Sequence, residues 1–413
     1  MNPTGSAPGS QASLREMNRL RVLDAVREHG ALTQVEIAGV TGLSAATVSN
    51  LVKELDSAGA VELTPSIRNG RRAVQVSVAS DGGLVGAAVF GDRDVRVAVG
   101  SAGTAEVVSQ KRMPLPADHA ADEGMGRAAR MVQEMVEASG HALKDLGCLV
   151  VGLPAPIDTV SGEVGSNGIL PGWRGVPVAR AMGDAYGMPV QLENTANLAA
   201  VGEARYGALQ GISTGVYLKM SYGVGAGLIV GSELFRGSAG TAGEIGHVTI
   251  DEDGPVCRCG NRGCLDTFVG SQAVLSALRP SHGSLTLRDV ISRALEGDLG
   301  CRRVLEDAGR HVGVALAGVV NLLNPEVVVV GGQVSRVGEI VLRPMREAIE
   351  RCAVPSAAAS VEVRLGLLGP EEADVRGALA LAEQVRAEAD RATIAGGGSI
   401  VTQSLSQNLV FKS

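Results

Sequence analysis

Three cysteines and two glycines share residues 257–264, CRCGNRGC, in a chain of 413 residues that has only six cysteines. His247 precedes them, so the full spacing is H-x9-C-x-C-x4-C. Three thiolates and one imidazole form a tetrahedral ligand set that zinc takes in closed, structural sites. Disulfides and free thiols are the alternatives, but close-set cysteines in a reducing compartment more often bind metal. The spacing predicts one structural zinc ion, bound by His247, Cys257, Cys259 and Cys264.

Two carboxylates flank this motif. Glu244 lies three residues before His247, and Asp266 lies two residues after Cys264. An ion bound by the motif would hold both carboxylates and the imidazole close together. Carboxylates fixed in this way are good acceptors for the hydroxyl groups of a sugar. A solvated surface loop is the alternative interpretation.

The composition excludes several classes of function for the whole chain. A formal charge of −7 and a pI near 5.5 argue against a polybasic nucleic-acid coat, although one small domain can still bind DNA. Four Phe, four Tyr and one Trp are too few for platforms that stack single-stranded bases. The sequence has no apolar run of about 18 residues and no signal-like N-terminus, so we expect a cytoplasmic protein without membrane contact.

The elements that must position these groups fall into at least two domains, because single cores rarely exceed about 250 to 300 residues. Residues 1–12 are rich in Gly, Ser, Pro and Ala, and we expect a disordered arm. A helix ending near Gly30 is then predicted by an apolar residue at every third position: Leu14, Met17, Leu20, Leu23 and Val26.

Two further helices follow closely. Thr33 and Glu36 form a capping box that predicts the start of a short second helix, and Gly42 predicts its end. Ser44 is predicted to cap a third helix, AATVSNLVKELDSAG. One face of this third helix is predicted to be buried through apolar residues at helical spacing: Val48, Leu51, Val52 and Leu55.

The other face of the third helix carries small and hydrogen-bonding side chains, which suit a helix lying in the major groove of DNA. The turn Asn69-Gly70 then predicts a β-hairpin, with two arginines beside its tip that can reach a minor groove or a phosphate. The order of elements is that of a winged helix-turn-helix over residues 13–80; a small packing module is the alternative. The predicted DNA contacts are Ser44, Ala45, Ala46, Thr47, Ser49, Asn50, Lys53, Arg71 and Arg72.

The charge of this domain bears on how it would bind. Residues 1–80 hold eight Lys and Arg against seven Asp and Glu, so the domain is only weakly basic. Weak basicity predicts modest non-specific affinity for DNA. We therefore expect two winged helices to act together on one palindromic operator, in a homodimer or a dimer of dimers.

From Gly83 onward, strand-like apolar runs alternate with helical ones, which is the pattern of an α/β fold. A similar succession occurs twice, which suggests two lobes with a cleft between them. Three glycine-containing turns follow predicted strands, FGDRD at 90–94, SYGVGAG at 221–227 and GGQVS at 331–335. Backbone N–H groups in such turns can bind phosphate, although each turn alone is a weak signal.

Several segments in this order resemble the ROK family of repressors and sugar kinases: LPAPIDTVSGEVGSNGILPGW, ENTANLAAVGEARYG, AGEIGH, CRCGNRGCLDTF and VVVVGGQVS. The resemblance covers roughly residues 14–390. It implies a two-lobed, actin-like fold of the ribonuclease-H type behind the winged helix-turn-helix. On this basis we expect lobe 1 at residues 83–195, completed by a helix at about 370–390, and lobe 2 with the zinc loop at 196–369. Residues 393–413 are expected to form a flexible tail.

The resemblance also implies which residues bind ligands. Zinc in the family is bound by groups that match His247, Cys257, Cys259 and Cys264. The sugar is bound by groups that match Asn167, Asn194, Thr195, Glu244, His247 and Asp266. Asp266 stands where the family usually has Glu, which shortens that side chain by about one methylene and changes the preference for ligands.

Three positions depart from the kinase members of the family. Kinases read E-N-D-A-N where this chain has ENTAN, so Thr195 replaces the Asp that accepts a proton from the sugar. General-base catalysis is typically worth about 10² to 10⁴ in rate, and threonine cannot supply it. Val89 replaces the acid of the first phosphate loop, D-x-G, and Tyr222 stands in the second loop, G-T-G, where it would crowd a phosphate. We therefore expect no catalytic residues and no enzyme.

The sequence as a whole predicts a transcriptional regulator that acts as a repressor and whose operator affinity is controlled by a sugar or sugar derivative. A sugar kinase is one alternative, disfavoured by Thr195 and Val89. A regulator that has lost its sugar and responds to a protein partner is another. Because the carboxylate is missing at position 195, a modified sugar, a phosphosugar or an oligosaccharide are all open as effectors.

Overall fold

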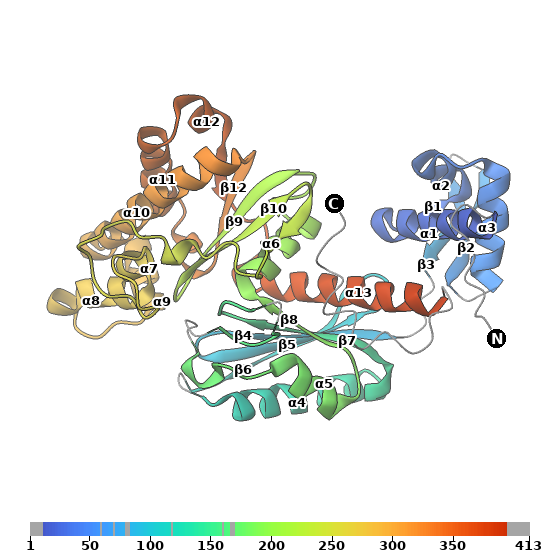
Figure 1. The fold of residues 1–413 in the computed structure, drawn as a ribbon, viewed down its shortest axis with the longest axis horizontal. Coiled ribbons are helices and arrows are strands. Elements are labelled where there is room, and N and C mark those ends of the chain that lie inside the picture. Colours follow the sequence, from blue (N-terminus) through green and yellow to red (C-terminus); the bar gives the residue numbers. More distant parts are fainter. Residues whose placement is uncertain are drawn as a thin grey trace. The chain divides into compact units, whose positions relative to one another are not determined.

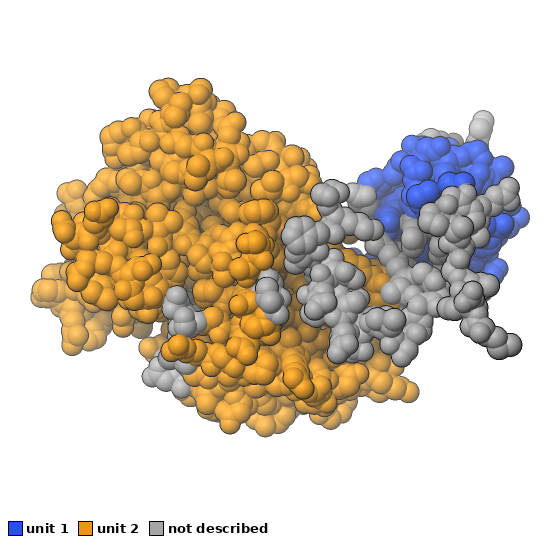
Figure 2. Space-filling view, viewed as in Figure 1, with its two compact units in different colours: residues 1–84, 100–106 blue, residues 85–99, 107–413 orange. Residues whose placement is uncertain are grey.

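The computed structural model describes residues 11–57, 60–68, 71–78, 83–116, 119–158, 161–165 and 170–394 (Figure 1). The chain divides into two compact units, one of residues 1–84 and 100–106 and the other of residues 85–99 and 107–413 (Figure 2). Each unit has its own core. Asn167, Asn69 and Gly70 and the predicted tail beyond Ile394 lie outside the described residues.

The first unit is a winged helix-turn-helix. Its helices are α1 (Gln11–His29), α2 (Gln34–Thr41) and α3 (Ala45–Ser57). Its sheet has the order β1-β3-β2, from β1 (Leu32–Thr33), β3 (Arg71–Val78) and β2 (Val61–Arg68). The core unites one face of each helix with the sheet through buried apolar side chains: Val22, Leu23, Val26, Ile37, Val48, Leu51, Val52, Leu55, Val61 and Val76.

The ends of the helices are set by the residues that the sequence indicates. Thr33 and Glu36 form the capping box of α2, and Gly42 ends α2 in the left-handed region at φ 69° with its N–H donating to Ala38 O. The hydroxyl of Ser44 accepts a 3.1 Å hydrogen bond from Thr47 N at the start of α3. These two caps fix the turn between α2 and α3, because each supplies a partner to an otherwise unpaired backbone group.

Two expectations about this unit are wrong in part. Helix α1 begins at Gln11, inside the segment expected to be disordered. Leu14 and Met17 are about half exposed, at 49% and 51%, whereas Leu23 and Val26 are buried. The apolar spacing therefore marks the core face only along the second half of α1.

In the hairpin, Arg68 pairs with Arg71, which agrees with the predicted two-residue turn between β2 and β3.

The second unit contains two five-stranded sheets with the same strand order. The first sheet runs β6-β5-β4-β7-β8 and the second β11-β10-β9-β12-β13. In each, three consecutive strands form a meander, and two later strands extend the sheet beyond its first strand. The strands are β4 (Leu84–Phe90), β5 (Asp94–Ser101), β6 (Val107–Pro114), β7 (Leu146–Leu153), β8 (Val190–Asn194), β9 (Thr214–Met220), β10 (Val224–Val230), β11 (Glu233–Phe235), β12 (Val327–Gly331) and β13 (Glu362–Leu365). This repetition confirms the two predicted α/β lobes.

Helices cover both sheets. On the first sheet, α4 (Ala121–Ala138) and α5 (Val178–Tyr186) lie on one face and α13 (Ala373–Ile394) on the other (Figure 1). The second lobe is built around the packing of α10 (Leu299–Leu323) against α11 (Glu339–Cys352). Its smaller helices are α7 (Asp266–Val269), α8 (Ser271–His282), α9 (Leu287–Leu295) and α12 (Pro355–Ser360).

The last helix returns to the first lobe, as expected from the sequence, since α13 packs on β7 and on α6 (Thr195–Tyr206). Glycines let α6 and α13 approach closely: a Cβ on Gly202 would lie 2.1 Å from Ala373 O, and one on Gly377 would lie 1.7 Å from Leu198 O. Of the described helices, none alone has the length and apolar composition of a membrane span, and α2 and α3 reach it only together, across a 114° bend.

Candidate metal centre and adjacent pocket

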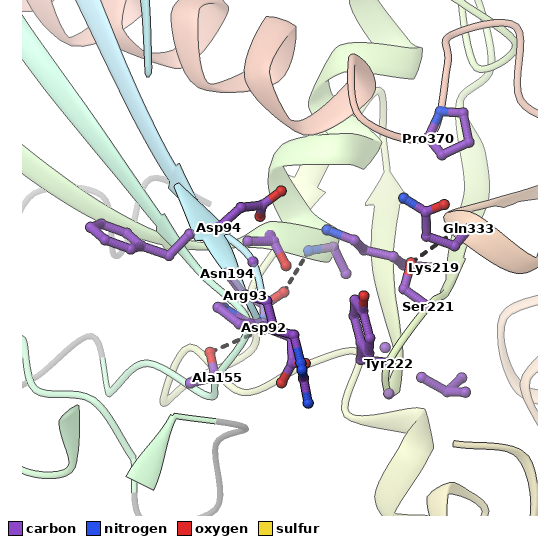
Figure 3. Close-up of a pocket in the computed structure, with 18 of the residues that line it drawn as sticks. Asp92, Arg93, Asp94, Ala155, Asn194, Lys219, Ser221, Tyr222, Gln333 and Pro370 are labelled. Atoms are coloured by element: carbon purple, nitrogen blue, oxygen red, sulfur yellow. Dashed lines mark hydrogen bonds and ion pairs between the residues drawn. The ribbon is translucent and has the colours of Figure 1, made fainter. Parts of the chain in front are cut away.

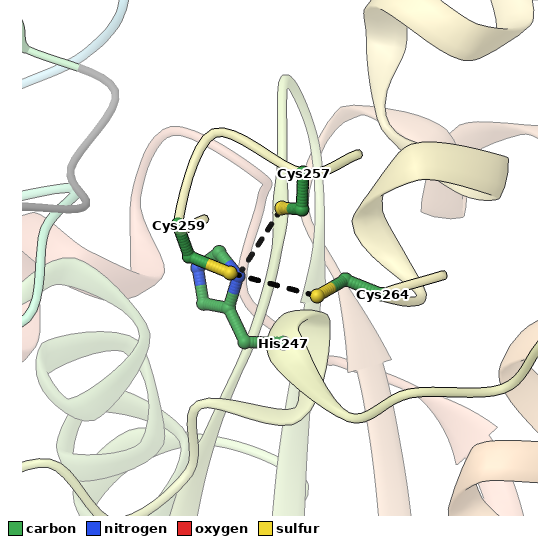
Figure 4. A group of neighbouring side chains, drawn as sticks. All are labelled: His247, Cys257, Cys259 and Cys264. Carbon is green, nitrogen blue, oxygen red and sulfur yellow. Dashed lines mark hydrogen bonds between the residues drawn. The ribbon is translucent and has the colours of Figure 1, made fainter. Parts of the chain in front are cut away.

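The four residues of the predicted zinc motif converge in the second lobe (Figure 4). Their ligand atoms, one from each of His247, Cys257, Cys259 and Cys264, all lie within 4.8 Å of one another. Cys257 Sγ lies 3.6 Å from His247 Nδ1, and Cys259 Sγ lies 3.6 Å from Cys264 Sγ. Three sulfur donors and one nitrogen at such spacing are compatible with a tetrahedral zinc site that has no open position.

Backbone hydrogen bonds shape the cysteine loop. Cys257 N donates to Asn261 O at 2.7 Å, and Gly260 N donates to Cys257 O at 2.9 Å. Gly260 and Gly263 have φ values of 92° and 66°, in the region that favours glycine. A Cβ on Gly263 would lie 1.5 Å from Asp251 O, so only glycine fits there. The two glycines of the motif are therefore needed to bring the thiols together.

Burial shifts the pKa of two side chains near the cysteines, His247 and Glu244. It lowers the pKa of His247, which favours the neutral imidazole that a metal needs. Burial, followed by the nearby carboxylate of Asp266, raises the pKa of Glu244 to about 7. Glu244 Oε2 lies 3.9 Å from His247 Nε2. The predicted sugar acceptor Glu244 and the predicted zinc ligand His247 are thus direct neighbours.

A pocket opens beside this centre (Figure 3). Five of the six residues expected to bind sugar line it: Asn194, Thr195, Glu244, His247 and Asp266. The sixth, Asn167, lies outside the described residues. Residues of all three glycine-containing turns also line the pocket. The structure therefore brings together side chains that are far apart in the sequence, at the ends of β8 and β9 and the starts of α6 and α7.

Some of these side chains already form hydrogen bonds with the protein backbone. The amide oxygen of Asn194 caps α6 by accepting from Ala196 N at 2.7 Å, and its amide nitrogen donates to Ala155 O at 3.0 Å. One N–H of Asn194 thus remains for a ligand. Asp266 Oδ1 accepts from Val224 N at 3.2 Å, which places its carboxylate at the start of β10.

Arg258 is a pocket residue that the sequence analysis missed. It stands between the first two cysteines, lines the pocket, and donates to Asp266 Oδ2 at 3.1 Å. The sequence did contain a signal for Arg258, namely its position between the two expected metal ligands Cys257 and Cys259. A side chain between two such ligands must point away from the ion. The pair with Arg258 neutralises one of the two carboxylates expected to accept sugar hydroxyls.

A second polar group is largely buried and contributes Arg96 and Lys219 to the lining of the same pocket. Arg96 of β5 forms a bidentate pair with Asp374 of α13, at 2.7 and 3.0 Å, and Lys219 of β9 donates to the same carboxylate at 2.8 Å. The three side chains are only 7%, 1% and 16% exposed. Burial opposes ionisation, yet the charges of Arg96 and Lys219 hold the pKa of Asp374 well below its usual range.

Two further carboxylates and one further cation complete this group. Arg112 pairs with Asp94 and, at 3.5 Å, with Glu371. We call these six residues the internal ion cluster: Arg96, Arg112, Lys219, Asp94, Glu371 and Asp374. It holds three cations and three carboxylates, so its charge balances internally. The signal for it was one charged residue inside an apolar strand, as in VRVAV and YLKM, because such a residue requires a buried partner.

In the first unit, the predicted DNA-contacting face of α3 is accessible. Ala45, Ala46, Asn50 and Lys53 are exposed, and Thr47 and Ser49 are half-buried. Ser44 is exposed, and its hydroxyl lies 2.8 Å from that of Thr47, so both are partly engaged in the cap. The side chains of Arg71 and Arg72 lie outside the described residues, and only their place at the start of β3 is given.

Comparison with known proteins gives matches for both units. Residues 86–385 match the model of the ROK family, and residues 16–72 match the model of the MarR family. A putative xylose repressor of Caldicellulosiruptor sp. (strain Rt8B.4) is 28% identical over 389 residues, which cover 90% of this chain and 97% of that protein. A glucokinase of Halalkalibacterium halodurans is 32% identical over 264 residues, covering 60% of this chain and 80% of the enzyme.

Solved structures support the fold. The crystal structure of a ROK family transcriptional regulator, a homologue of the E. coli MLC protein, superposes with a TM-score of 0.77 at 22% identity. The superposition covers 93% of this chain and 100% of that chain. The expected architecture, a winged helix-turn-helix followed by a two-lobed sugar-kinase fold, is thereby confirmed.

Proposed function

The chain belongs to the ROK family, and from this premise we propose that it is a sequence-specific DNA-binding repressor controlled by a sugar or sugar derivative. One observation carries the proposal. A winged helix-turn-helix precedes a sugar-kinase body whose pocket has kept three of the family's sugar-binding residues, Asn194, Glu244 and His247. Asp266 stands in place of the usual Glu, and Thr195 stands in place of the catalytic carboxylate. A body of this kind can bind a sugar without phosphorylating it.

The DNA-binding part of the proposal is supported by the exposed face of α3. Asn50 can donate and accept hydrogen bonds with adenine, the methyl groups of Ala45 and Ala46 suit thymine, and Lys53 can contact phosphate. The arginines Arg71 and Arg72 at the start of β3 would serve the wing. Because the domain is weakly basic, we propose that two copies act together on a palindromic operator, as a homodimer or a dimer of dimers.

The ligand part is supported by the pocket and by the names of the relatives. Several relatives of this chain are xylose repressors, including one from Bacillus subtilis that is 27% identical over 342 residues. Asn194, Glu244 and Asp266 offer an N–H and two carboxylates toward a polyhydroxylated ligand. D-xylose is therefore the first sugar to test, with hexoses and sugar phosphates beside it.

A kinase is the rival function, since glucokinases share this fold. Three features of the chain oppose it. Thr195 is 3% exposed and has no carboxyl to take a proton from a sugar hydroxyl. The three cations of the internal ion cluster are all paired with carboxylates, so they supply no surplus positive charge for a triphosphate. Val89, at the acidic position of the kinases, is fully buried in β4.

A zinc ion fits the four converging donors, and we propose that it is structural. His247, Cys257, Cys259 and Cys264 would hold it, and it would supply no open coordination position for chemistry. Its contribution is to fix the loop that carries Arg258 and to orient His247 beside Glu244. Ion and ligand site then share one residue, His247, which couples the metal to ligand binding.

The proposed mechanism has two states. A sugar that binds one arrangement of the lobes more tightly shifts the population toward it. In a dimer, that arrangement would change the spacing of the two winged helices and therefore the affinity for the operator. By linkage, the operator must weaken sugar binding by the same factor that the sugar weakens operator binding.

Selection of duplexes from genomic DNA by the purified full-length chain tests the DNA-binding part. A thermal-shift screen with sugars and sugar phosphates tests the ligand part, because a ligand at about 100 times its Kd adds roughly 2.7 kcal/mol of stability. Recovery of one palindromic motif together with a stabilising sugar supports the proposal. Recovery of a motif with no stabilising sugar would favour a regulator that responds to a protein partner instead.

A further inference from the structure

Resting on the proposed function, we infer that the pocket accepts a glycoside of at least two linked units, and that Tyr222 is the stacking surface for the second unit. The residues expected to bind a single sugar occupy only part of the lining. The rest of the lining combines one exposed aromatic ring with polar and charged side chains, several of which are paired with one another. That combination suits a neutral, polyhydroxylated ring rather than a nucleotide.

Tyr222 lies between the two polar groups of the pocket. It stands in the turn between β9 and β10, three residues after Lys219, which contacts Asp374, and two residues before Val224, whose N–H binds Asp266. Figure 3 shows its ring in the pocket among Asp92, Lys219 and Ser221. The ring therefore borders both the sugar-binding residues and the internal ion cluster.

Three hydrogen bonds hold this turn, one within it and two from Ser271 and Gln333. Ser221 N donates to Gly223 O at 3.0 Å, and Ser271 N donates to Tyr222 O at 2.9 Å. Gln333 N donates to the hydroxyl of Ser221 at 3.0 Å. An aromatic ring on a fixed backbone loses little conformational entropy when a ligand packs on it. Tyr222 is nevertheless 37% exposed, so one part of its surface is open to a ligand.

The lobe opposite Tyr222 offers hydrogen bonds and little net charge. Burial, followed by the carboxylates of Asp92 and Asp94, raises the pKa of Tyr222, so the phenol stays protonated at neutral pH. Asp92 is paired with Arg93 at 3.5 Å, and Asp94 is paired with Arg112. Such paired groups can exchange hydrogen bonds with hydroxyls but leave no free charge for a phosphate.

The chemistry of a sugar ring matches this arrangement. One face of a pyranose presents C–H groups, which pack on an aromatic ring, while its hydroxyls point outward to polar side chains. A triphosphate would instead need surplus cations and space at the glycines of the turn. Tyr222 stands in that turn beside Gly223, so the residue expected to crowd a phosphate offers its ring to a second sugar instead.

Calorimetry with matched sugars tests the inference on the full-length protein. The probes are D-xylose against xylobiose and D-glucose against cellobiose. We expect one disaccharide to bind at least about tenfold more tightly than its monosaccharide, a difference of roughly 1.4 kcal/mol. Tyr222→Ala should reduce that difference to less than about threefold with the monosaccharide affinity unchanged, and Tyr222→Phe should retain it, since the ring is kept.

Three results would overturn the inference. Equal affinity for both members of each pair would remove the second subsite while leaving the proposed sugar control intact. A gain in disaccharide affinity in Tyr222→Ala would identify the ring as an obstruction. Binding of no sugar by the wild-type chain would remove the proposed function and the inference with it. Thermal unfolding of both variants shows whether a loss of binding reflects a loss of fold.

Discussion

Lys219 of β9 and Asp374 of α13 meet in a 2.8 Å ion pair that joins the two lobes, although 155 residues separate them in the chain. The carboxylate also binds Arg96 of β5 through both of its oxygens. Asp374 is 1% exposed and Lys219 is 16% exposed, so water screens this pair weakly. Lys219 lines the pocket, and the pair ties the second sheet to the helix that covers the first.

Removal of one partner from this buried group is expected to be costly. Asp374→Asn leaves Arg96 and Lys219 without their carboxylate, and loss of one partner of a buried ion pair typically costs about 3 to 5 kcal/mol. Thermal unfolding should therefore show a fall of several degrees in Tm. As a control, Asp307→Asn breaks an exposed pair with Arg310, whose side chains are 40% and 46% exposed, and should change stability by less than about 1 kcal/mol. Equal shifts in the two variants would contradict a tie between the lobes.

Loss of the metal is expected to remove the ligand response and leave DNA binding. Cys257→Ser with Cys259→Ser takes away two of the four ligands, so metal analysis should fall from about one zinc per chain to none. Operator binding should persist, because the winged helix has a core of its own. Cys352→Ser is the matched control, since Cys352 is exposed and lies outside the cluster. A metal-free variant with a normal sugar response would reject the proposed role of the loop.

Two exposed residues of α3 should affect DNA binding in different ways. Asn50→Ala removes a candidate base contact and should cost about 1 to 3 kcal/mol on the preferred duplex, with specificity relaxed at one base pair. Lys53→Ala removes a candidate phosphate contact and should weaken binding to all sequences, with the salt slope reduced by about 1. Fluorescence anisotropy at several salt concentrations separates the two effects. Ser57→Ala, at the far end of α3, serves as the control.

No phosphoryl transfer is expected from this chain. ATP turnover on a panel of pentoses and hexoses should stay at background, because Thr195 cannot act as the base. Thr195→Asp restores a carboxyl at that position but leaves the internal ion cluster and Tyr222 in place, so it should also remain inactive. Steady formation of a sugar phosphate by the purified wild type would contradict the assignment as a regulator.

Local features of the fold could be predicted from the sequence. The capping box at Thr33, the stop at Gly42 and the buried stripe of α3 depend on residues within one or two turns, and all three are confirmed. The convergence of the histidine and the three cysteines could be predicted for the same reason, since three of these four donors lie within eight residues.

Features that depend on tertiary packing could not be predicted. The apolar spacing of α1 gave no sign that Leu14 and Met17 stay half exposed, because spacing shows which face is apolar and not what covers it. The contact between Lys219 and Asp374 follows from the return of α13 to the first lobe. The charged residue within YLKM signalled that a buried partner was needed, but the sequence did not identify which one.

The affinity of the full-length chain for its selected duplex, measured by anisotropy with and without sugar, tests the central claim most directly. We predict sub-micromolar binding at low salt that a saturating sugar weakens at least about tenfold, a coupling of roughly 1.4 kcal/mol. No affinity for any duplex at low salt, or an affinity that no pentose, hexose, disaccharide or sugar phosphate changes, would contradict a sugar-controlled repressor.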